Sequence, residues 1–217
     1  MKITVIGASG MVGHRVVHEA ASRGHNVIGV SRGRAPQTTL ASVHWVTADA
    51  GEKDSLRSVF ADADTAILAV RADPGAGANL ARMTTTVLDA AAASGTRVLV
   101  IGGAGPLRTP HDHDLLVADD PRYVPPQVRA VAAASIGQLH ACRRHPDADW
   151  TYLSPPALLA PGERTGRYRR GTQTLLVDPS GTSRISAEDL AVAVLDEIEL
   201  PSRHHHLTVA SAPLPPE

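Results

Sequence analysis

The chain has 217 residues, a length that suits one α/β domain with a large core. Its formal net charge is −1, which gives no overall field for nucleic acid or an anionic membrane surface. Aromatic residues make up only 3% of the chain, so a surface that stacks on nucleic-acid bases is not expected. No apolar run approaches the ~20 residues that span a bilayer, so a transmembrane helix is not expected either. The lone Cys142 cannot form an internal disulfide and is expected to be buried.

The first part of the chain alternates between short apolar strands and amphipathic helices. We expect strands at residues 2–6, 26–30 and 43–47, a glycine-rich turn at 7–13 and a polar Arg-bearing loop at 31–39. We also expect a helix that begins at Val12 and is closed by Gly24, and a second helix at 53–60. A secretory leader would begin with a charged region followed by a long apolar run. The chain shows a strand pattern from Lys2 instead, so we expect a cytoplasmic protein.

The alternation continues through the middle of the chain. We expect strands at residues 65–70, 97–101 and 150–153, helices at 79–93 and 128–144, and a long proline-bearing loop between residues 102 and 127. Strands that alternate with helices indicate βαβ units with right-handed crossovers. The sequence therefore predicts an α/β fold, a Rossmann doubly wound parallel sheet with helices on both faces.

The last part, about residues 155–217, is expected to be a small substrate-capping subregion of the same single domain, which spans residues 1–217. Short strands are expected within 167–177, around Gly171, and a last strand at 207–210. A helix is expected at 186–199, with Ser186 as its N-cap and Ser186-x-x-Asp189 resembling a capping box.

A glycine motif follows the first strand and opens the first helix. Gly7 allows a sharp turn, Gly10 allows backbone N–H groups to approach a pyrophosphate, and Gly13 allows the helix to pack close to the sheet. The free N–H groups at the start of the helix then favour the phosphates. The residues predicted to bind the cofactor here are Gly7, Ser9, Gly10, Met11, Val12 and Gly13. The alternative, that these are plain turn glycines, accounts less well for three of them at this spacing.

The end of the second strand indicates which dinucleotide binds. An NAD site usually places an acidic side chain there, whereas an NADP site supplies Arg for the 2′-phosphate. No Asp or Glu stands in this segment, but Ser31, Arg32 and Arg34 do. NADP(H) is therefore the preferred cofactor, with NAD(H) as a possibility, and a solvated Arg loop is the alternative interpretation.

Other strand ends should border the same ligand, because ligands of open α/β sheets lie outside the carboxyl ends of the strands. Asp49 and Ala50 follow the third strand, and Asp49 is a candidate acceptor for the adenine amino group, with a plain helix or turn cap as the alternative. The remaining residues predicted to border the cofactor are Ala69, Val70, Arg71, Gly102 and Gly103.

These motifs identify a family resemblance over nearly the whole chain. Its carriers are the glycine motif 7–13, Gly102-Gly103-Ala104-Gly105, and the segments 153–158, 161–169 and 183–191. The chain resembles atypical short-chain dehydrogenases/reductases of the NAD(P)H-binding family, in particular the branch called NADH-flavin reductases, which is related to biliverdin reductase B and NmrA-like proteins. The resemblance implies a Rossmann fold, NAD(P)(H) binding and reduction of a flavin-like or other conjugated acceptor.

The usual acid of short-chain dehydrogenases is missing. That acid is the Tyr of Tyr-x-x-x-Lys, but Gln127, Pro156 and Thr172 stand four residues after Tyr123, Tyr152 and Tyr168. In the biliverdin reductase relative a His follows the paired prolines that match Pro155-Pro156, whereas Ala157 stands here. No catalytic residue is therefore assigned. A flavin, quinone or bilin accepts a hydride into a conjugated system and depends less on acid catalysis, so positioning should dominate.

Candidates for the substrate pocket come from three places. Ala104 and Pro106 should lie near the nicotinamide, and the long loop that carries His111, His113 and Tyr123 is a candidate lid. The others are Pro156, Ala157 and Tyr168, and for every candidate a surface or packing role is the alternative. Ser154 is expected to form a hydrogen bond at a strand end, and His204-His205-His206 to be a solvated turn with no metal.

The expected function is an NAD(P)H-dependent oxidoreductase that transfers a hydride to a flavin, quinone or similar conjugated small molecule. One alternative is a non-catalytic NAD(P)-binding redox sensor of NmrA type, which the missing Tyr-Lys pair favours. Another is a redox-neutral isomerase or cyclase of a biosynthetic pathway. The expected partner is a small-molecule substrate, with no nucleic acid and no membrane, and the protein is expected to be a monomer or homodimer.

Overall fold

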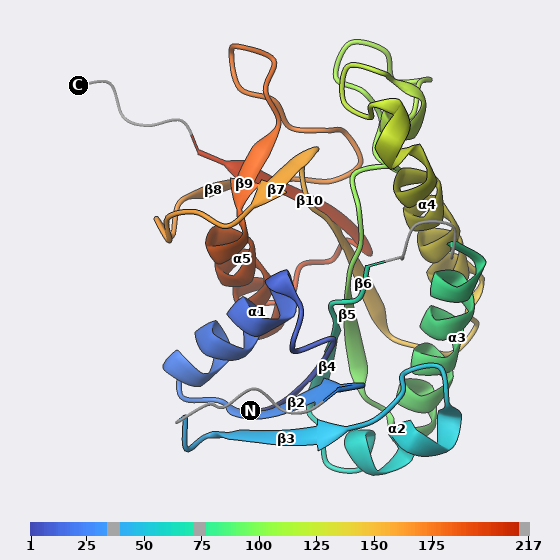
Figure 1. The fold of residues 1–217 in the computed structure, drawn as a ribbon, viewed down its shortest axis with the longest axis vertical. Coiled ribbons are helices and arrows are strands. Elements are labelled where there is room, and N and C mark those ends of the chain that lie inside the picture. Colours follow the sequence, from blue (N-terminus) through green and yellow to red (C-terminus); the bar gives the residue numbers. More distant parts are fainter. Residues whose placement is uncertain (34–39, 72–76, 213–217) are drawn as a thin grey trace.

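An eight-stranded sheet runs through the middle of the computed structural model, with helices on both of its faces (Figure 1). The structure describes residues 1–33, 40–71 and 77–212. The strand order is β3-β2-β1-β4-β5-β6-β10-β8, in which every neighbouring pair is parallel except β10 and β8. The strands are β1 (Lys2–Ile6), β2 (Asn26–Ser31), β3 (Val43–Thr47), β4 (Thr65–Leu68), β5 (Arg97–Ile101), β6 (Trp150–Ser154), β8 (Tyr168–Gly171) and β10 (His206–Ser211). The predicted Rossmann doubly wound fold is confirmed.

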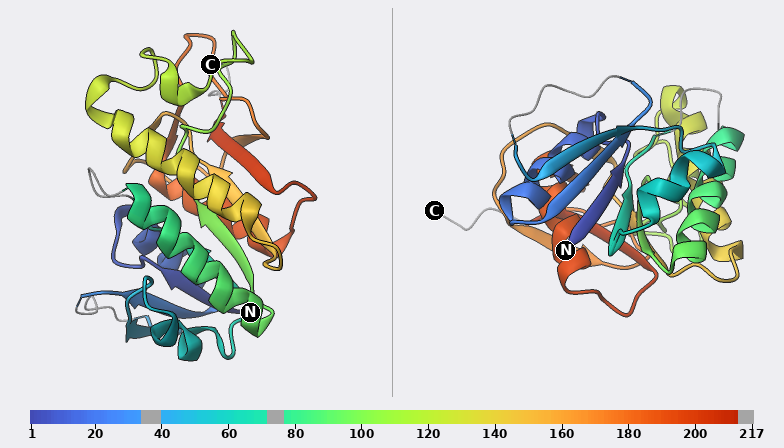
Figure 2. Two further views of the ribbon diagram at one scale, coloured as in Figure 1. Left: turned by 90° about the vertical axis from the view of Figure 1, so that its right-hand side faces the viewer. Right: turned by 90° about the horizontal axis from the view of Figure 1, so that it is seen from below.

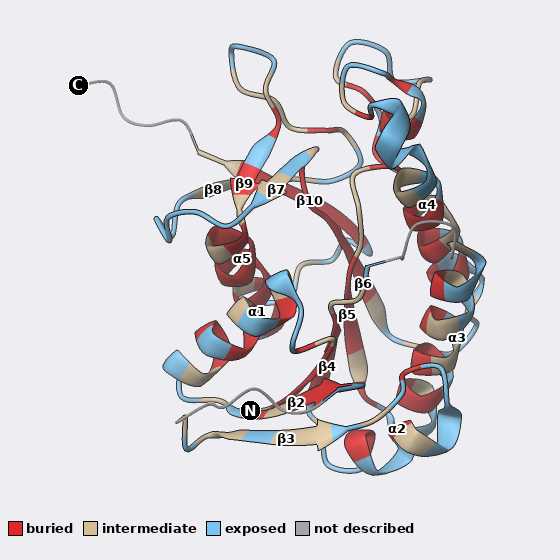
Figure 3. Ribbon diagram, in the orientation of Figure 1, coloured by how far each residue is buried: buried red, intermediate tan, exposed pale blue. Residues whose placement is uncertain are grey.

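Two groups of helices cover the sheet (Figure 2). One face carries α1 (Met11–Ser22) and α5 (Ala187–Glu199), and the other carries α2 (Lys53–Phe60), α3 (Gly77–Ser94) and α4 (Arg129–Arg144). Because both faces are covered, the central strands are apolar on both sides and almost fully buried (Figure 3). In β1, for example, Ile3 and Val5 pack with α1 and α5, and Ile6 packs with the α2 and α3 side. No helix in the described ranges has both the length and the apolar character that a membrane crossing needs.

The long loop after β5 has an apolar cluster of its own. It contains two short 3-10 helices, η1 (Val117–Asp119) and η2 (Pro126–Val128). Leu107, Val117 and Val124 from this loop are buried together with Leu175 from the C-terminal part of the chain. The loop is therefore packed against the segment that follows β8.

The prediction of a strand after Gly171, within residues 172–177, is wrong. Only β8 forms there, and the segment after it instead pairs with the long loop: Arg108 N–H donates to Gln173 O at 2.8 Å, and Leu175 N–H donates to Arg108 O at 2.9 Å. The sequence also missed a two-stranded parallel sheet of β7 (Leu158–Ala160) and β9 (Arg184–Ser186). Strand β4 ends at Leu68, two residues before its predicted end at residue 70.

The start of α5 is only partly as predicted. Ser186 is the N-cap, and its Oγ accepts a hydrogen bond from Asp189 N–H at 3.0 Å. The Asp189 carboxylate does not return this bond to Ser186, as a capping box would require. It accepts from Thr165 N–H, Thr165 Oγ1–H and Gly166 N–H at 2.8, 2.6 and 2.8 Å. This carboxylate thus fastens the loop between β7 and β8 to α5.

Candidate cofactor-binding site

The glycine turn between β1 and α1 is tightly packed. Gly7 has a φ of +84°, and a Cβ at this position would lie 2.5 Å from Ala69 O. A Cβ on Gly13 would lie 2.1 Å from Gly7 O, so α1 rests directly on the turn. These two positions require glycine because any side chain would force the turn away from β4 or from α1.

The first turn of α1 carries no side-chain cap. Its N-cap residue is Gly10, whose backbone is extended and which offers no capping side chain, and the first turn contains no acidic residue. The N–H groups at the start of this helix, with the positive end of the helix dipole, therefore favour an anion. Met11, Val12 and Gly13, three of the residues predicted to bind the cofactor, form this first turn.

A cavity of about 210 Å³ opens beside this turn, at the carboxyl ends of β1, β2 and β4. The structure brings most of the predicted cofactor residues together around it: Gly7, Ser9, Gly10, Ser31, Arg32, Asp49, Ala50, Ala69, Val70 and Arg71. The sequence missed four further lining residues, Ile6, Val30, Ala48 and Met83. Met83 comes from α3, and no local sequence signal connects that helix with the glycine motif.

The corner of this cavity at the end of β2 is cationic. Ser31 is buried and its Oγ–H donates to Gly33 O at 3.0 Å, whereas Arg32 is exposed and lines the cavity. Asp49 Oδ1 accepts a hydrogen bond from Gly51 N–H at 2.8 Å, so Asp49 is a turn cap that also faces the cavity. The predicted Arg34 lies outside the described residues.

The glycines after β5 have a structural explanation that the sequence did not reveal. A Cβ on Gly102 would lie 2.0 Å from both Cζ and Oη of Tyr152, and a Cβ on Gly103 would lie 2.9 Å from Ser135 Cβ. Gly102 and Gly103 are not among the residues that line the cavity. They follow the end of β5, however, which is the strand beside β4. Leu68 of β4 pairs with Val100 of β5, so Val70 and Gly102, each two residues further along, stand at equivalent positions.

Residues of the long loop that were predicted to face the substrate have packing or ionic partners. Ala104 and Tyr123 pack against the apolar cluster of the loop, and Pro106 is half-buried. His111 lies 3.4 Å from the buried Asp120 carboxylate, which also binds Arg122. Hydrogen bonds from Arg122 hold the pKa of Asp120 below its usual range. A role of these residues in the substrate pocket stays a prediction.

The remaining pocket candidates are divided between two places. Pro156 is buried, and Ala157 N–H donates to Ser183 Oγ at 3.4 Å. Tyr168 packs with the α1 and α5 cluster, and its hydroxyl donates to Asp196 of α5. Burial and Asp196 raise the pKa of Tyr168 above its usual range. Tyr168 therefore has a partner on α5, and its predicted contact with substrate stays a prediction.

The histidines near the last strand differ from one another. His206 is buried at 6% exposure, so its interpretation as part of a solvated turn is wrong, whereas His204 and His205 are exposed. His206 Nε2 lies 3.0 Å from Ser154 Oγ, and this contact confirms Ser154 as a hydrogen-bonding residue at a strand end. Among the described residues, no three His, Cys, Asp or Glu side chains form a group that could hold a metal ion.

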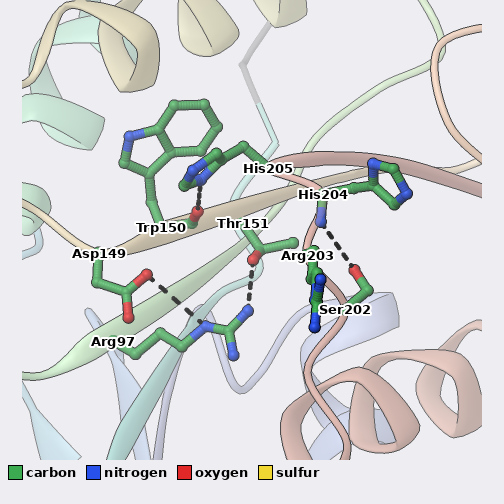
Figure 4. A pocket seen from close by; sticks show the side chains of 8 residues that line it. All are labelled: Arg97, Asp149, Trp150, Thr151, Ser202, Arg203, His204 and His205. Atoms are coloured by element: carbon green, nitrogen blue, oxygen red, sulfur yellow. Dashed lines mark hydrogen bonds and ion pairs between the residues drawn. The ribbon is translucent and has the colours of Figure 1, made fainter.

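A second cavity, of about 290 Å³, lies at the amino ends of β5 and β6 (Figure 4). It is larger and mostly polar: its lining residues are Arg97, Asp149, Trp150, Thr151, Ser202, Arg203, His204 and His205. Its Arg97 is held by Thr151 Oγ1 at 2.7 Å and by the carboxylates of Asp149 and Glu197 at 4.0 and 3.6 Å. Because doubly wound sheets bind ligands at the carboxyl ends of their strands, the smaller cavity beside the glycine turn is the candidate cofactor site.

Comparison with known proteins identifies the family of the chain. The family model described as NAD(P)H-binding matches residues 7–201. Protein YwnB of Bacillus subtilis, which is uncharacterised, is 33% identical over 97% of this chain and 99% of its own length. The 3-diazoavenalumate denitrifying reductase of a Streptomyces species is 31% identical over 82% of this chain and 62% of its own length.

Two solved structures extend the comparison. The "putative NADH-flavin reductase" of Streptococcus pneumoniae is 28% identical with a TM-score of 0.85, over 98% of this chain and 100% of that one. The "putative epimerase" of Bacteroides thetaiotaomicron is 32% identical with a TM-score of 0.87, over 99% of each chain. The reductases among these relatives support an oxidoreductase. The family match covers most of the chain, so the chain belongs to the NAD(P)H-binding family.

Proposed function

We propose that this protein is an NADPH-dependent reductase that delivers a hydride to a flavin, a quinone or a similar conjugated small molecule. The observation that carries the proposal is the cavity beside the uncapped start of α1, with Arg32 at its outer corner. The N–H groups of the first helical turn would hold the pyrophosphate, and Asp49 would accept from the adenine amino group.

The choice of NADPH over NADH follows from charge at the end of β2. Arg32 lines the cavity, and residues 31–39 contain no Asp or Glu that would bind a ribose 2′-hydroxyl or repel a 2′-phosphate. A guanidinium can form charge-assisted hydrogen bonds with phosphate oxygens. The bound nicotinamide would supply the hydride, and the chain would bind and orient it.

The choice of a conjugated acceptor follows from the placement of the tyrosines and lysines. Lys2 forms an ion pair with Asp62 at 3.0 Å, and Lys53 is exposed at the start of α2. Neither stands four residues after a tyrosine, so the usual Tyr-Lys acid is missing. An acceptor that spreads the developing charge over a conjugated system needs this acid least, and the relatives named as reductases support a reductive reaction.

The test is oxidation of NADPH and of NADH, followed at 340 nm with panels of flavins and quinones, together with the dissociation constant of each cofactor. We expect turnover with NADPH and weaker binding of NADH. Gly10→Asp should weaken NADPH binding by about 100-fold or more, because its carboxylate would stand where the pyrophosphate binds. Ser58→Asp is the matched control, since it adds the same charge on the exposed side of α2 and should leave binding unchanged. Equal affinity for the two cofactors would contradict the NADPH preference.

The same experiment separates the alternative functions. Tight cofactor binding without oxidation by any acceptor would favour a non-catalytic sensor, which the missing Tyr-Lys pair also allows. Conversion of a substrate without net NADPH consumption would favour a redox-neutral isomerase, an activity closer to the epimerase name of the Bacteroides relative.

A further inference from the structure

Tyr152 occupies the space beneath the turn that follows β5. Its side chain is fully buried in the middle of β6. The ring lies so close to Gly102 that a Cβ on Gly102 would lie 2.0 Å from Cζ and 2.4 Å from Cε1. The path of the chain at the end of β5 is therefore set by the Tyr152 ring.

The Tyr152 hydroxyl connects this turn with α4. Its O–H donates to Ser135 O at 2.9 Å, and it accepts a longer hydrogen bond from Gly103 N–H at 3.4 Å. Gln138 Oε1 lies within 3.3 Å as a second acceptor. Burial raises the pKa of Tyr152 above its usual range, so the hydroxyl stays protonated and keeps its role as a donor. One oxygen atom thus joins β5, β6 and α4.

The surroundings of Tyr152 are polar although they are buried. His206 contacts the Tyr152 ring edge-on with a centroid distance of 5.4 Å, and Thr208 pairs in register with Ser154 on the same face of the sheet. Within the described part of the chain, Gln138 Nε2, His206 Nδ1 and Thr208 Oγ1 are buried without a hydrogen-bond partner.

The turn held by Tyr152 lies beside the candidate cofactor site. Val70 lines the cavity, and Gly102 stands at the equivalent position on the neighbouring strand. The strand order from β2 through β1 and β4 leads to β5, and dinucleotides lie across the carboxyl ends of such strands. A dinucleotide with its adenosine at β2 and its pyrophosphate at α1 would therefore extend its nicotinamide toward the end of β5. We propose that Tyr152 is a positioning residue for hydride transfer, because it fixes the Gly102-Gly103 turn against which the nicotinamide would lie. This inference rests on the proposed function.

The test compares Tyr152→Phe, which removes only the hydroxyl, with Thr4→Val. Thr4 is an equally buried residue whose hydroxyl donates to Val59 O at 3.1 Å, away from the turn, so its replacement also removes one buried hydroxyl and keeps the shape of the side chain. Misplacement of reacting atoms by about 1 Å costs on the order of 100-fold in rate. We therefore expect Tyr152→Phe to slow hydride transfer, measured in a single turnover, by about 10-fold or more. The NADPH dissociation constant should change little, because the phosphate and adenine contacts remain.

A second readout does not depend on turnover. Amide hydrogen exchange at Gly103 should become faster in Tyr152→Phe and stay unchanged in Thr4→Val. Equal single-turnover rates in the two variants, or unchanged exchange at Gly103, would overturn the positioning role. A rate and an affinity that fall together would overturn it too, since they indicate general damage to the site.

Failure of the proposed function gives a different result. If the wild type binds NADPH but reduces no acceptor, the reductase proposal fails. The fluorescence of the bound nicotinamide is then measured in place of the rate of hydride transfer. A change in that fluorescence in Tyr152→Phe, without a change in affinity, would still support positioning of the nicotinamide. Unchanged fluorescence would overturn it.

Discussion

His206 keeps its imidazole inside the protein in the neutral form. Burial, with a smaller contribution from the positive charge of Arg143, lowers the pKa of His206 to about 4. In the unfolded chain the same group has its ordinary pKa, near 6.5. Between these two values the unfolded chain binds a proton that the folded chain does not, so acidification favours unfolding over that range.

This difference predicts a pH-dependent stability. As the pH falls from about 6.5 to about 4, the free energy of unfolding should decrease by up to about 3 kcal/mol because of this one side chain. Urea unfolding of His206→Gln should show a shallower decrease over the same range. His204→Gln, which alters an exposed neighbour, should keep the slope of the wild type. Identical slopes in all three proteins would show that His206 does not titrate in this way.

At the scale of elements, the N-terminus of α5 serves a loop as well as its own helix. Ser186 caps the helix through the backbone N–H of Asp189, and the Asp189 carboxylate accepts three hydrogen bonds from Thr165 and Gly166. Nearby, the Glu188 carboxylate binds Arg15 of α1 and accepts from Gly162 N–H at 2.7 Å. The first turn of α5 thus fastens the β7–β8 loop to the helix layer.

Replacement of Asp189 by Asn should loosen that loop without removing the helix cap. The bond between Ser186 Oγ and the backbone N–H of residue 189 remains, but the amide cannot accept as many hydrogen bonds as the carboxylate. We expect a loss of about 2 kcal/mol in unfolding free energy and faster hydrogen exchange over residues 161–167. Asp54→Asn, at the exposed first turn of α2, is the matched control. A loss of the same size in the control would contradict the role of Asp189.

The elements that could be predicted from the sequence are those whose signals are local. The bounds of β1, β3, α2 and β5 agree with the predicted ranges because each of these elements shows its pattern of apolar residues within its own short segment. β7 and β9 have only three residues each, too few to show a period. The prediction for the segment after Gly171 was wrong for another reason. The partner of this segment is Arg108, more than sixty positions earlier, and no local pattern reveals such pairing.

At the scale of the whole molecule, the candidate cofactor site is assembled from strand ends that the fold places along one edge. The ends of β1, β2 and β4 could be predicted as lining because parallel strands deliver their carboxyl ends to the same side. Met83 could not, because α3 brings it to the cavity only after the chain has folded. The contact of Tyr152 with α4 could not be predicted either, for the same reason. The burial of Cys142, by contrast, follows from composition and is confirmed.

The cationic corner of this site predicts a change of cofactor preference. Arg32→Glu should weaken NADPH binding by at least about 10-fold, since it replaces a charge-assisted hydrogen bond by repulsion, and should leave or improve NADH binding. Isothermal titration with both cofactors measures the change. Arg203→Glu makes the same charge change at the opposite cavity and should alter neither affinity. A uniform loss for both cofactors would show that Arg32 does not distinguish them.

The uncapped start of α1 has a consequence for any attempt to make this protein more robust. Ser, Asn and Asp are better N-caps than Gly, by roughly a few tenths of a kcal/mol. A screen for thermal resistance would therefore favour these residues at position 10, where the side chain would occupy the N–H groups that we assign to the ligand. At residue 10, selection for higher stability without ligand would therefore act against cofactor binding.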